Sequence, residues 1–151
     1  MIVRRANAGD VPAFLSLIAE YWIFEGLDGF EPAALQAPLE RLLSSPALGA
    51  VWIATEAEKP LGYLSLVYVF SLEHRGMTAE IDELFVLPEH CAGGIGSRLL
   101  SQAERESMRR GCTNVSLQVS RRNDRAIAFY RRHGYSARSA FRLLEKALRA
   151  G

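Results

Sequence analysis

Residues 83–100 read ELFVLPEHCAGGIGSRLL and contain the pattern that decides the fold. An apolar run typical of a β-strand ends at Pro88, and a glycine-containing loop then leads into a segment with helical spacing of its apolar residues. The first turn of a helix has backbone N–H groups without partners and carries a partial positive charge. A strand, a glycine loop and a helix in this order therefore predict a phosphate site, with Gly94 and Gly96 opening the backbone to a pyrophosphate.

Two other phosphate-binding motifs do not match this stretch. The dinucleotide fingerprint requires G-x-G-x-x-G after a first strand, whereas Gly94 and Gly96 are followed by Leu99 and lie in the middle of the chain. A P-loop requires a lysine after its last glycine, and none follows here. Taken alone, the segment also fits a strand-to-helix turn that binds no ligand.

A second motif lies at residues 123–135, which read NDRAIAFYRRHGY. Asn123 or Asp124 can cap a helix, and Gly134 ends it. Its apolar residues share one face at spacings of three and four. Taken alone, the motif is also compatible with an ordinary amphipathic helix that has Tyr130 in the core.

The whole chain predicts a mixed α/β fold with helices on both faces of one sheet and the order β-α-α-β-β-β-α-β-α-β. One helix follows Asp10 and Pro12, and another follows Pro32. Pro38 is expected in the first turn of that second helix, because a proline inside it would cost about 3 kcal/mol. Strands are expected at 2–5, 50–55, 61–70, 78–87 and 115–119, helices at 94–110 and 124–133, and one or two further strands between 135 and 148, about six to seven strands in all.

Length and composition exclude several classes of protein. The 151 residues predict a single domain over 1–151, and 49% apolar residues are enough for a core. The net charge of +1 argues against a nucleic-acid partner held by bulk positive charge, and no apolar stretch approaches the roughly 20 residues that span a membrane. The two cysteines form no CxxC pair, so neither a disulfide framework nor a metal site is expected. We therefore expect a reduced, cytoplasmic protein.

Charge is distributed unevenly along the chain. Residues 6–40 contain six acidic residues and no Lys, Arg or His, whereas residues 98–151 contain thirteen bases and four acids. This asymmetry favours one cationic and one anionic ligand. The alternative is two solvated surfaces that attract each other.

Together, the two motifs resemble the GNAT superfamily of N-acetyltransferases. The shared pattern is V-x-P-E, then x-x-G-x-G at a helix start, then N-x-x-A-x-x-F-Y-x-x-x-G-Y about 27 residues later. The resemblance covers essentially the whole chain and is sharpest from Glu80 to Tyr135. The stretch 82–86 looks like that of the diamine (spermidine/spermine) acetyltransferases, which carry adjacent acids there. The chain departs from the family at Cys91 and Ala92, where the loop usually begins with Arg or Gln.

The resemblance implies that acetyl-CoA is the co-substrate, bound where the parallel strands 80–87 and 114–119 separate. One strand would pair its backbone with the pantetheine arm and polarise the thioester carbonyl, the glycine loop would hold the pyrophosphate, and Asn123 would bind near the pantetheine. The backbone residues assigned in this way are Leu84, Phe85 and Val86 for the pantetheine, and Ala92, Gly93, Gly94, Ile95, Gly96 and Ser97 for the pyrophosphate.

The resemblance also assigns Tyr130 to the cofactor site, as the acid that protonates the departing thiolate. A phenol with a pKa near 10 can return a proton to a thiolate whose thiol has a pKa near 8.5 at little cost. Cys91 could instead carry the acyl group as a nucleophile, but His90 is the sole obvious base beside it.

The acceptor amine must lose a proton before it attacks, and a carboxylate can take it. Strand alternation places Glu80, Asp82 and Leu84 on one face and the residues between and after them, Ile81, Glu83 and Phe85, on the other. The family often has a carboxylate at the position of Asp82. Asp82 is therefore the first candidate base and Glu83 the second, and a solvated strand-edge carboxylate is the alternative for each.

These features predict an N-acetyltransferase that acts on the primary amine of a small, cationic acceptor by direct attack in a ternary complex. Glu25 and Asp28, in the region that shapes the acceptor site in the family, and Asp82 would bind the acceptor. Dimers are frequent among relatives, which suggests a homodimer. The alternatives are a non-catalytic acyl-CoA-binding regulatory module and a protein or peptide N-acetyltransferase.

Overall fold

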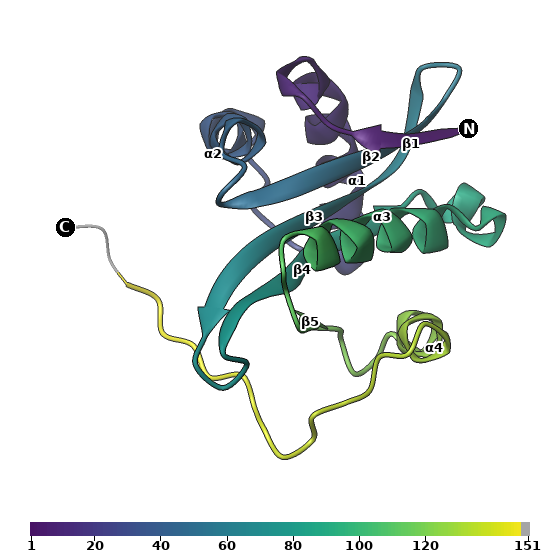
Figure 1. The fold of residues 1–151 in the computed structure, drawn as a ribbon. Helices are drawn as coiled ribbons and strands as arrows, with labels where there is room; N and C mark the ends of the chain where they lie inside the picture. Colours follow the sequence, from purple (N-terminus) through teal and green to yellow (C-terminus); the bar gives the residue numbers. More distant parts are fainter. Residues whose placement is uncertain (149–151) are drawn as a thin grey trace. The chain divides into compact units, whose positions relative to one another are not determined.

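A computed structural model describes residues 1–148 of the protein, which form parts of two compact units (Figure 1). The first unit is Met1–Gln118, and the described part of the second runs from 119 to 148. Within residues 1–148, no helix is both long enough and apolar enough to cross a membrane. The two units are considered separately below.

The first unit contains one five-stranded sheet with its strands in sequence order. The first three pairs, β1–β2, β2–β3 and β3–β4, are antiparallel. The last pair, β4–β5, is parallel and joins Ala79–Ile81 to Val115–Leu117. This parallel pair confirms the pairing that the family resemblance implied. The strands are β1 (Ile2–Arg5), β2 (Gly49–Glu56), β3 (Lys59–Ser71), β4 (Gly76–Val86) and β5 (Val115–Leu117).

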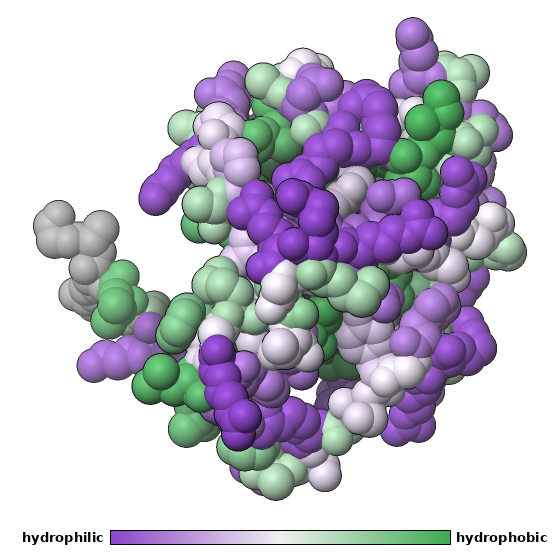
Figure 2. All heavy atoms as spheres, viewed as in Figure 1, coloured by the Kyte–Doolittle hydropathy of each residue, from purple (hydrophilic) through white to green (hydrophobic). Residues whose placement is uncertain are grey.

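Helices cover both faces of this sheet, as the sequence predicts (Figure 1). On one face lie α1 (Val11–Glu25) and α2 (Pro32–Ser44), and the core between them and the sheet includes Phe14, Tyr63 and Phe85. On the other face lies α3 (Ile95–Arg109), which is amphipathic: it buries Leu99, and Figure 2 shows hydrophilic side chains over its outer surface.

The sheet has five strands, so the prediction of about six to seven strands is wrong, and the strands expected between residues 135 and 148 are absent from these described residues. The final element of the predicted order is therefore missing. A strand needs a partner edge for its backbone N–H and C=O groups and an alternation of buried and exposed side chains. Leu143 and Leu144 are adjacent and both exposed, which breaks that alternation.

Pro38 also lies elsewhere than predicted. α2 begins at Pro32, which occupies the first turn, and Pro38 lies inside the helix. The apolar residues Leu35, Leu39 and Leu42 recur on the face that packs against the core, so the helix continues through the proline. Burial of this stripe offsets the roughly 3 kcal/mol that an internal proline costs.

Candidate active site

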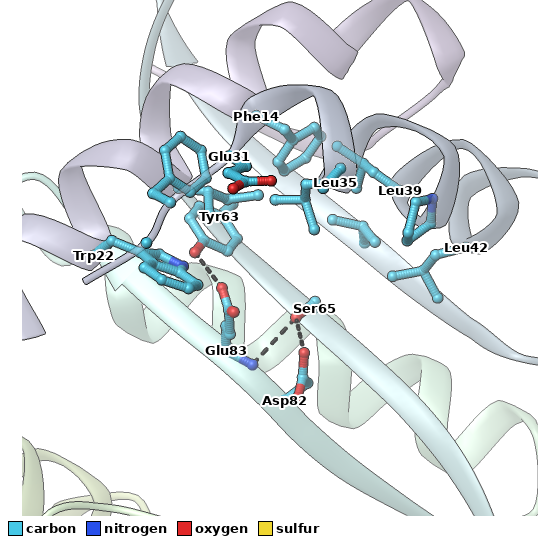
Figure 3. Close-up of a pocket in the computed structure, with 16 residues that line it drawn as sticks. Phe14, Trp22, Glu31, Leu35, Leu39, Leu42, Tyr63, Ser65, Asp82 and Glu83 are labelled. Atoms are coloured by element: carbon cyan, nitrogen blue, oxygen red, sulfur yellow. Dashed lines mark hydrogen bonds between the residues drawn. The ribbon is translucent and has the colours of Figure 1, made fainter. Parts of the chain in front are cut away.

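A β-bulge in β4 places two carboxylates next to each other. Ser65 of β3 pairs with Glu83, but the next residue of β3, Leu66, pairs with Ile81, so Asp82 is an extra residue on β4. Such a bulge interrupts the alternation of side chains between the two faces of a strand. Asp82 and Glu83 both line the same cavity as a result (Figure 3).

The bulge overturns the predicted alternation along this strand. Ile81 pairs with Leu66, on the face covered by α3, whereas Phe85 packs in the core under α1 and α2. Ile81 and Phe85 therefore do not share a face, and neither do Glu80 and Leu84, because the extra residue lies between them.

The cavity has a volume of about 410 Å³ and lies between α1, α2 and strands β2 to β4. Phe14 and Tyr63 form part of its buried floor, and Trp22 and Leu35 belong to its half-buried walls. In Figure 3, Asp82 and Glu83 lie on β4, across the cavity from the side chains of α2. All of these residues belong to the first unit.

Hydrogen bonds hold the two acids in place. The Tyr63 hydroxyl donates to the Glu83 carboxylate, and the Glu83 backbone N–H donates to Ser65 Oγ at 3.1 Å (Figure 3). Ser65 Oγ in turn lies 3.5 Å from Asp82 Oδ2. Ser65 thus bridges the bulge, while Tyr63 orients the Glu83 side chain.

Burial and mutual repulsion shift the ionisation of this cluster. Burial raises the pKa of the Glu83 carboxyl, the Tyr63 hydrogen bond partly opposes the rise, and the charge of Asp82 adds to it. The pKa of the Tyr63 hydroxyl is also raised, first by burial, then by the negative charge of Glu83 and by the hydrogen bond between Tyr63 and Glu83. Burial first, and then the neighbouring acids, raise the pKa of Tyr21 to about 12. A half-buried carboxylate with a raised pKa, such as that of Glu83, is suited to accept a proton near neutral pH.

Glu25 and Asp28 lie outside the lining of the cavity. Glu25 is the last residue of α1, Asp28 lies in the following loop, and both side chains are exposed. The acid that this region contributes to the lining is Glu31. Sequence reasoning assigned no role to Tyr63, because a tyrosine in a strand gives no local signal of an acid twenty residues away.

Three of the residues assigned to the pantetheine, Leu84, Phe85 and Val86, form the end of β4. β5 pairs with β4 only as far as Ile81, so in the described chain no strand pairs with this outer edge of β4 beyond the bulge. The Phe85 side chain belongs to the core. The backbone on the outer edge therefore has the geometry for an added strand-like ligand.

The glycine loop forms a short 3-10 helix at Pro88–Gly93 where the sequence predicted a loop, and α3 follows directly. Gly94 has a φ of 75°, which favours glycine, and Arg98 N–H donates to its carbonyl at 3.2 Å. By helix geometry, the N–H groups of Ile95, Gly96 and Ser97 have no partner within α3. A Cβ atom on Gly93 or Gly94 would meet no atom within 4 Å, so a phosphate group fits against this loop. Ala92 precedes the two glycines and is exposed.

Cys91 anchors the loop to the end of β4. Its Sγ lies 3.4 Å from the carbonyl oxygen of Val86 and 3.6 Å from that of Leu87. The thiol is thus in contact with backbone carbonyls, and Cys91 is not part of the lining of the cavity that contains Asp82 and Glu83. This contact disfavours the alternative in which Cys91 carries the acyl group.

In the second unit, α4 (Asp124–Arg132) carries the other two predicted site residues. Asn123 caps the helix, with Oδ1 accepting a hydrogen bond from the N–H of Ala126 at 3.1 Å, which confirms the predicted cap. The half-buried Tyr130 ring lies 5.2 Å from the Phe129 ring and 5.7 Å from the Tyr135 ring. Among residues 1–148, no group of three or more His, Cys, Asp or Glu side chains could hold a metal ion.

Comparison with known proteins shows the family of this chain. The family described as acetyltransferase (GNAT) matches residues 12–135. The uncharacterised N-acetyltransferase YhfO of Bacillus subtilis (strain 168) is 30% identical, with 93% of each chain covered. The thialysine N-epsilon-acetyltransferase of Bos taurus is 27% identical, covering 89% of this chain and 83% of that protein.

A solved structure shares this fold over nearly the whole chain. The crystal structure of the integron cassette protein HFX_CASS3, from the mobile metagenome of Cole Harbour Salt Marsh, superposes with a TM-score of 0.86 at 28% identity. The match covers 99% of this chain and 91% of that one. The family match over residues 12–135 is consistent with the bulged β4 and with the glycine loop at the start of α3. The chain belongs to the acetyltransferase (GNAT) family of enzymes.

Proposed function

We propose that the protein transfers the acetyl group of acetyl-CoA to the primary amine of a small acceptor that enters as an ammonium cation. The observation that carries the proposal is the pair of adjacent carboxylates, Asp82 and Glu83, in a cavity that is otherwise mainly apolar. An ammonium group fits such a pair because its desolvation is offset by charge and hydrogen bonding. The acetyl group would pass directly to the amine in a ternary complex, and the contacts of Cys91 with backbone carbonyls disfavour a covalent acyl-cysteine intermediate.

Two features support the binding of acetyl-CoA, which would supply the acetyl group as an activated thioester. The open backbone at Gly93 and Gly94 and the first turn of α3 suit the pyrophosphate. The outer edge of β4, from Leu84 to Val86, suits the pantetheine amides. Asn123 and Tyr130 of the second unit are assigned to the same co-substrate by the family resemblance.

Glu83 is the better candidate for the base that takes the amine proton. An amine with a pKa near 10 is almost fully protonated at pH 7, and its deprotonation costs roughly 4 kcal/mol. The pKa of the half-buried Glu83 carboxyl is raised toward neutral pH, where general bases are most effective. Asp82, which is exposed, would then hold the ammonium group. The sequence had favoured Asp82 as the base.

Tyr130 is proposed as the acid that protonates the thiolate after transfer. We further propose a single domain over 1–151 and a homodimer in the cytoplasm, without nucleic-acid or membrane partners. These proposals rest on sequence composition and on the family resemblance.

The proposal is tested with the purified protein, acetyl-CoA and a panel of small primary amines at pH 8. Release of free thiol and formation of the N-acetyl product, identified by mass spectrometry, should both depend on the amine. Binding of acetyl-CoA without transfer to any amine or peptide would instead indicate a non-catalytic acyl-CoA-binding module. Transfer to peptides alone would indicate a protein N-acetyltransferase.

A further inference from the structure

The cavity that contains Asp82 and Glu83 is walled mainly by apolar side chains. The rings of Trp22 and Phe30 belong to this lining, and their centroids lie 5.6 Å apart. Leu35 of α2 lies across the cavity from Asp82 and Glu83 (Figure 3). The volume of about 410 Å³ falls within the roughly 300–1,000 Å³ typical of small-molecule sites. The space is larger than an amino group requires, so most of it is available to the rest of the acceptor.

Charged groups in the lining are few and all negative. Asp82 and Glu83 stand together on β4, and the remaining acid, Glu31, is exposed next to the start of α2. No Lys, Arg or His side chain is part of this lining. One ammonium group has a paired site at Asp82 and Glu83, whereas a carboxylate has no partner within the cavity.

We infer that the acceptor is a monoamine whose single ammonium group is carried on an apolar body. This inference rests on the proposed function and narrows it. Trp22, Phe30 and Leu35 would contact the apolar body, and Asp82 and Glu83 would hold the nitrogen.

The strengths of the competing contacts favour this class over a diamine. Each methylene of the acceptor that is buried against the apolar wall contributes about 0.8 kcal/mol to the free energy of binding, which is about fourfold in affinity. A second ammonium group would either remain near Glu31, where an exposed ion pair contributes little, or be desolvated against the apolar wall at a larger cost. A free amino acid would bring a carboxylate toward the negative charges of Asp82 and Glu83.

An isosteric pair of amines tests the inference directly. Heptylamine and 1,6-diaminohexane have the same length and differ by a methyl group in place of an ammonium group. We expect kcat/KM to be at least tenfold higher for heptylamine, and to rise about twofold to fourfold per methylene from butylamine to heptylamine. 6-Aminohexanoate, which carries a carboxylate, should be at least a hundredfold poorer than heptylamine.

A pair of variants tests whether Leu35 contacts the apolar body of the acceptor. Leu35 and Leu43 are both half-buried on α2 and both pack against the core, but Leu35 lines the cavity and Leu43 does not. Leu35→Ala should lower the ratio of the heptylamine to the butylamine kcat/KM about fivefold or more. Leu43→Ala should leave that ratio unchanged, because a loss of folded protein lowers both values equally.

Binding is measured separately from turnover, so that failure of the inference differs from failure of the proposed function. Trp22 lines the cavity, and its fluorescence, identified by comparison with Trp22→Phe, should report heptylamine at lower concentrations than 1,6-diaminohexane. Such binding without acetylation of any amine would support the apolar site and overturn the proposed function. Acetylation of 1,6-diaminohexane as fast as heptylamine would overturn the inference alone. If no amine binds or reacts, both are overturned.

Discussion

The hydroxyl group of Tyr63 donates a hydrogen bond to the carboxylate of Glu83 across the antiparallel pair of β3 and β4. Tyr63 is buried and Glu83 is half-buried, and burial raises the pKa of each group. The bond supports the ionised form of Glu83, because a carboxylate accepts hydrogen bonds more strongly than its neutral acid. Tyr63 is therefore a positioning residue whose effect should appear in the pH dependence of the enzyme.

Replacing Tyr63 by Phe should move the acidic limb of the kcat/KM profile to higher pH. A base works when ionised, so activity is present above the pKa of Glu83 and is lost as the pH falls through it. Loss of the hydrogen bond raises this pKa further. At pH 6, activity should fall about tenfold, while the plateau at high pH changes less. A limb that does not move would show that Glu83 is not the titrating base.

Asp82 and Glu83 can be distinguished by isosteric amides. Glu83→Gln should lower kcat by roughly 10²–10⁴, the usual contribution of a general base. Asp82→Asn should keep a larger share of kcat and move the acidic limb to lower pH, because the negative charge of Asp82 raises the pKa of Glu83. Steady-state kinetics over pH 5–9 measure both effects, and the reverse ranking of kcat would assign the base to Asp82.

The glycine loop can be tested at two neighbouring positions. Gly93→Glu introduces a negative charge where a Cβ atom meets no neighbour, so the change should weaken acetyl-CoA binding at least tenfold without disturbing the fold. Gly93→Ala is the matched control for added bulk and should weaken binding less than Gly93→Glu, because it adds no charge. Gly94→Glu should weaken binding as well and should also lower stability, because Gly94 has a φ of 75°. Calorimetric titration measures affinity, and an unchanged Kd in Gly93→Glu would exclude the pyrophosphate from this loop.

Tyr130→Phe removes the proposed acid and keeps the aromatic ring that packs near Phe129 and Tyr135. We expect kcat to fall by roughly 10²–10⁴ with little change in acetyl-CoA affinity, because the hydroxyl would act after binding. Phe129→Leu, in the same cluster, is a control for packing. Near-normal kcat in Tyr130→Phe would assign the proton transfer to water or to another residue.

Glu25 and Asp28 lie outside the cavity lining, so any effect on a cationic acceptor must be long-range. The double change Glu25→Lys with Asp28→Lys should raise the KM of the amine about threefold or more at low salt and leave acetyl-CoA binding intact. The difference should vanish near 0.5 M salt, where charges farther apart than a few ångströms are screened. Glu56→Lys with Glu58→Lys, at the β2–β3 turn, makes the same change in charge elsewhere and should have a smaller effect. An unchanged KM in the first variant would leave these acids as a solvated surface.

Local signals account for what could be predicted. Four predicted features depend on residues close together in the chain: the strand before Pro88, the glycines at the start of α3, the first turn of that helix and the Asn123 cap. Hydrophobic periodicity and the conformational freedom of glycine act over this same short range. For this reason the sequence by itself determined the loop, the order of most elements and the family.

The tertiary structure decided which side chains meet. Whether Asp82 and Glu83 share a face depends on the bulge, which exists only relative to the partner strand β3, and the same register brings Tyr63 to Glu83. Pro38 stays inside α2 because the helix packs its apolar stripe against the core, which outweighs a local preference. The pairing register and the burial of a side chain both depend on contacts between residues that are distant in sequence. No local pattern could therefore have placed the two acids in an apolar cavity.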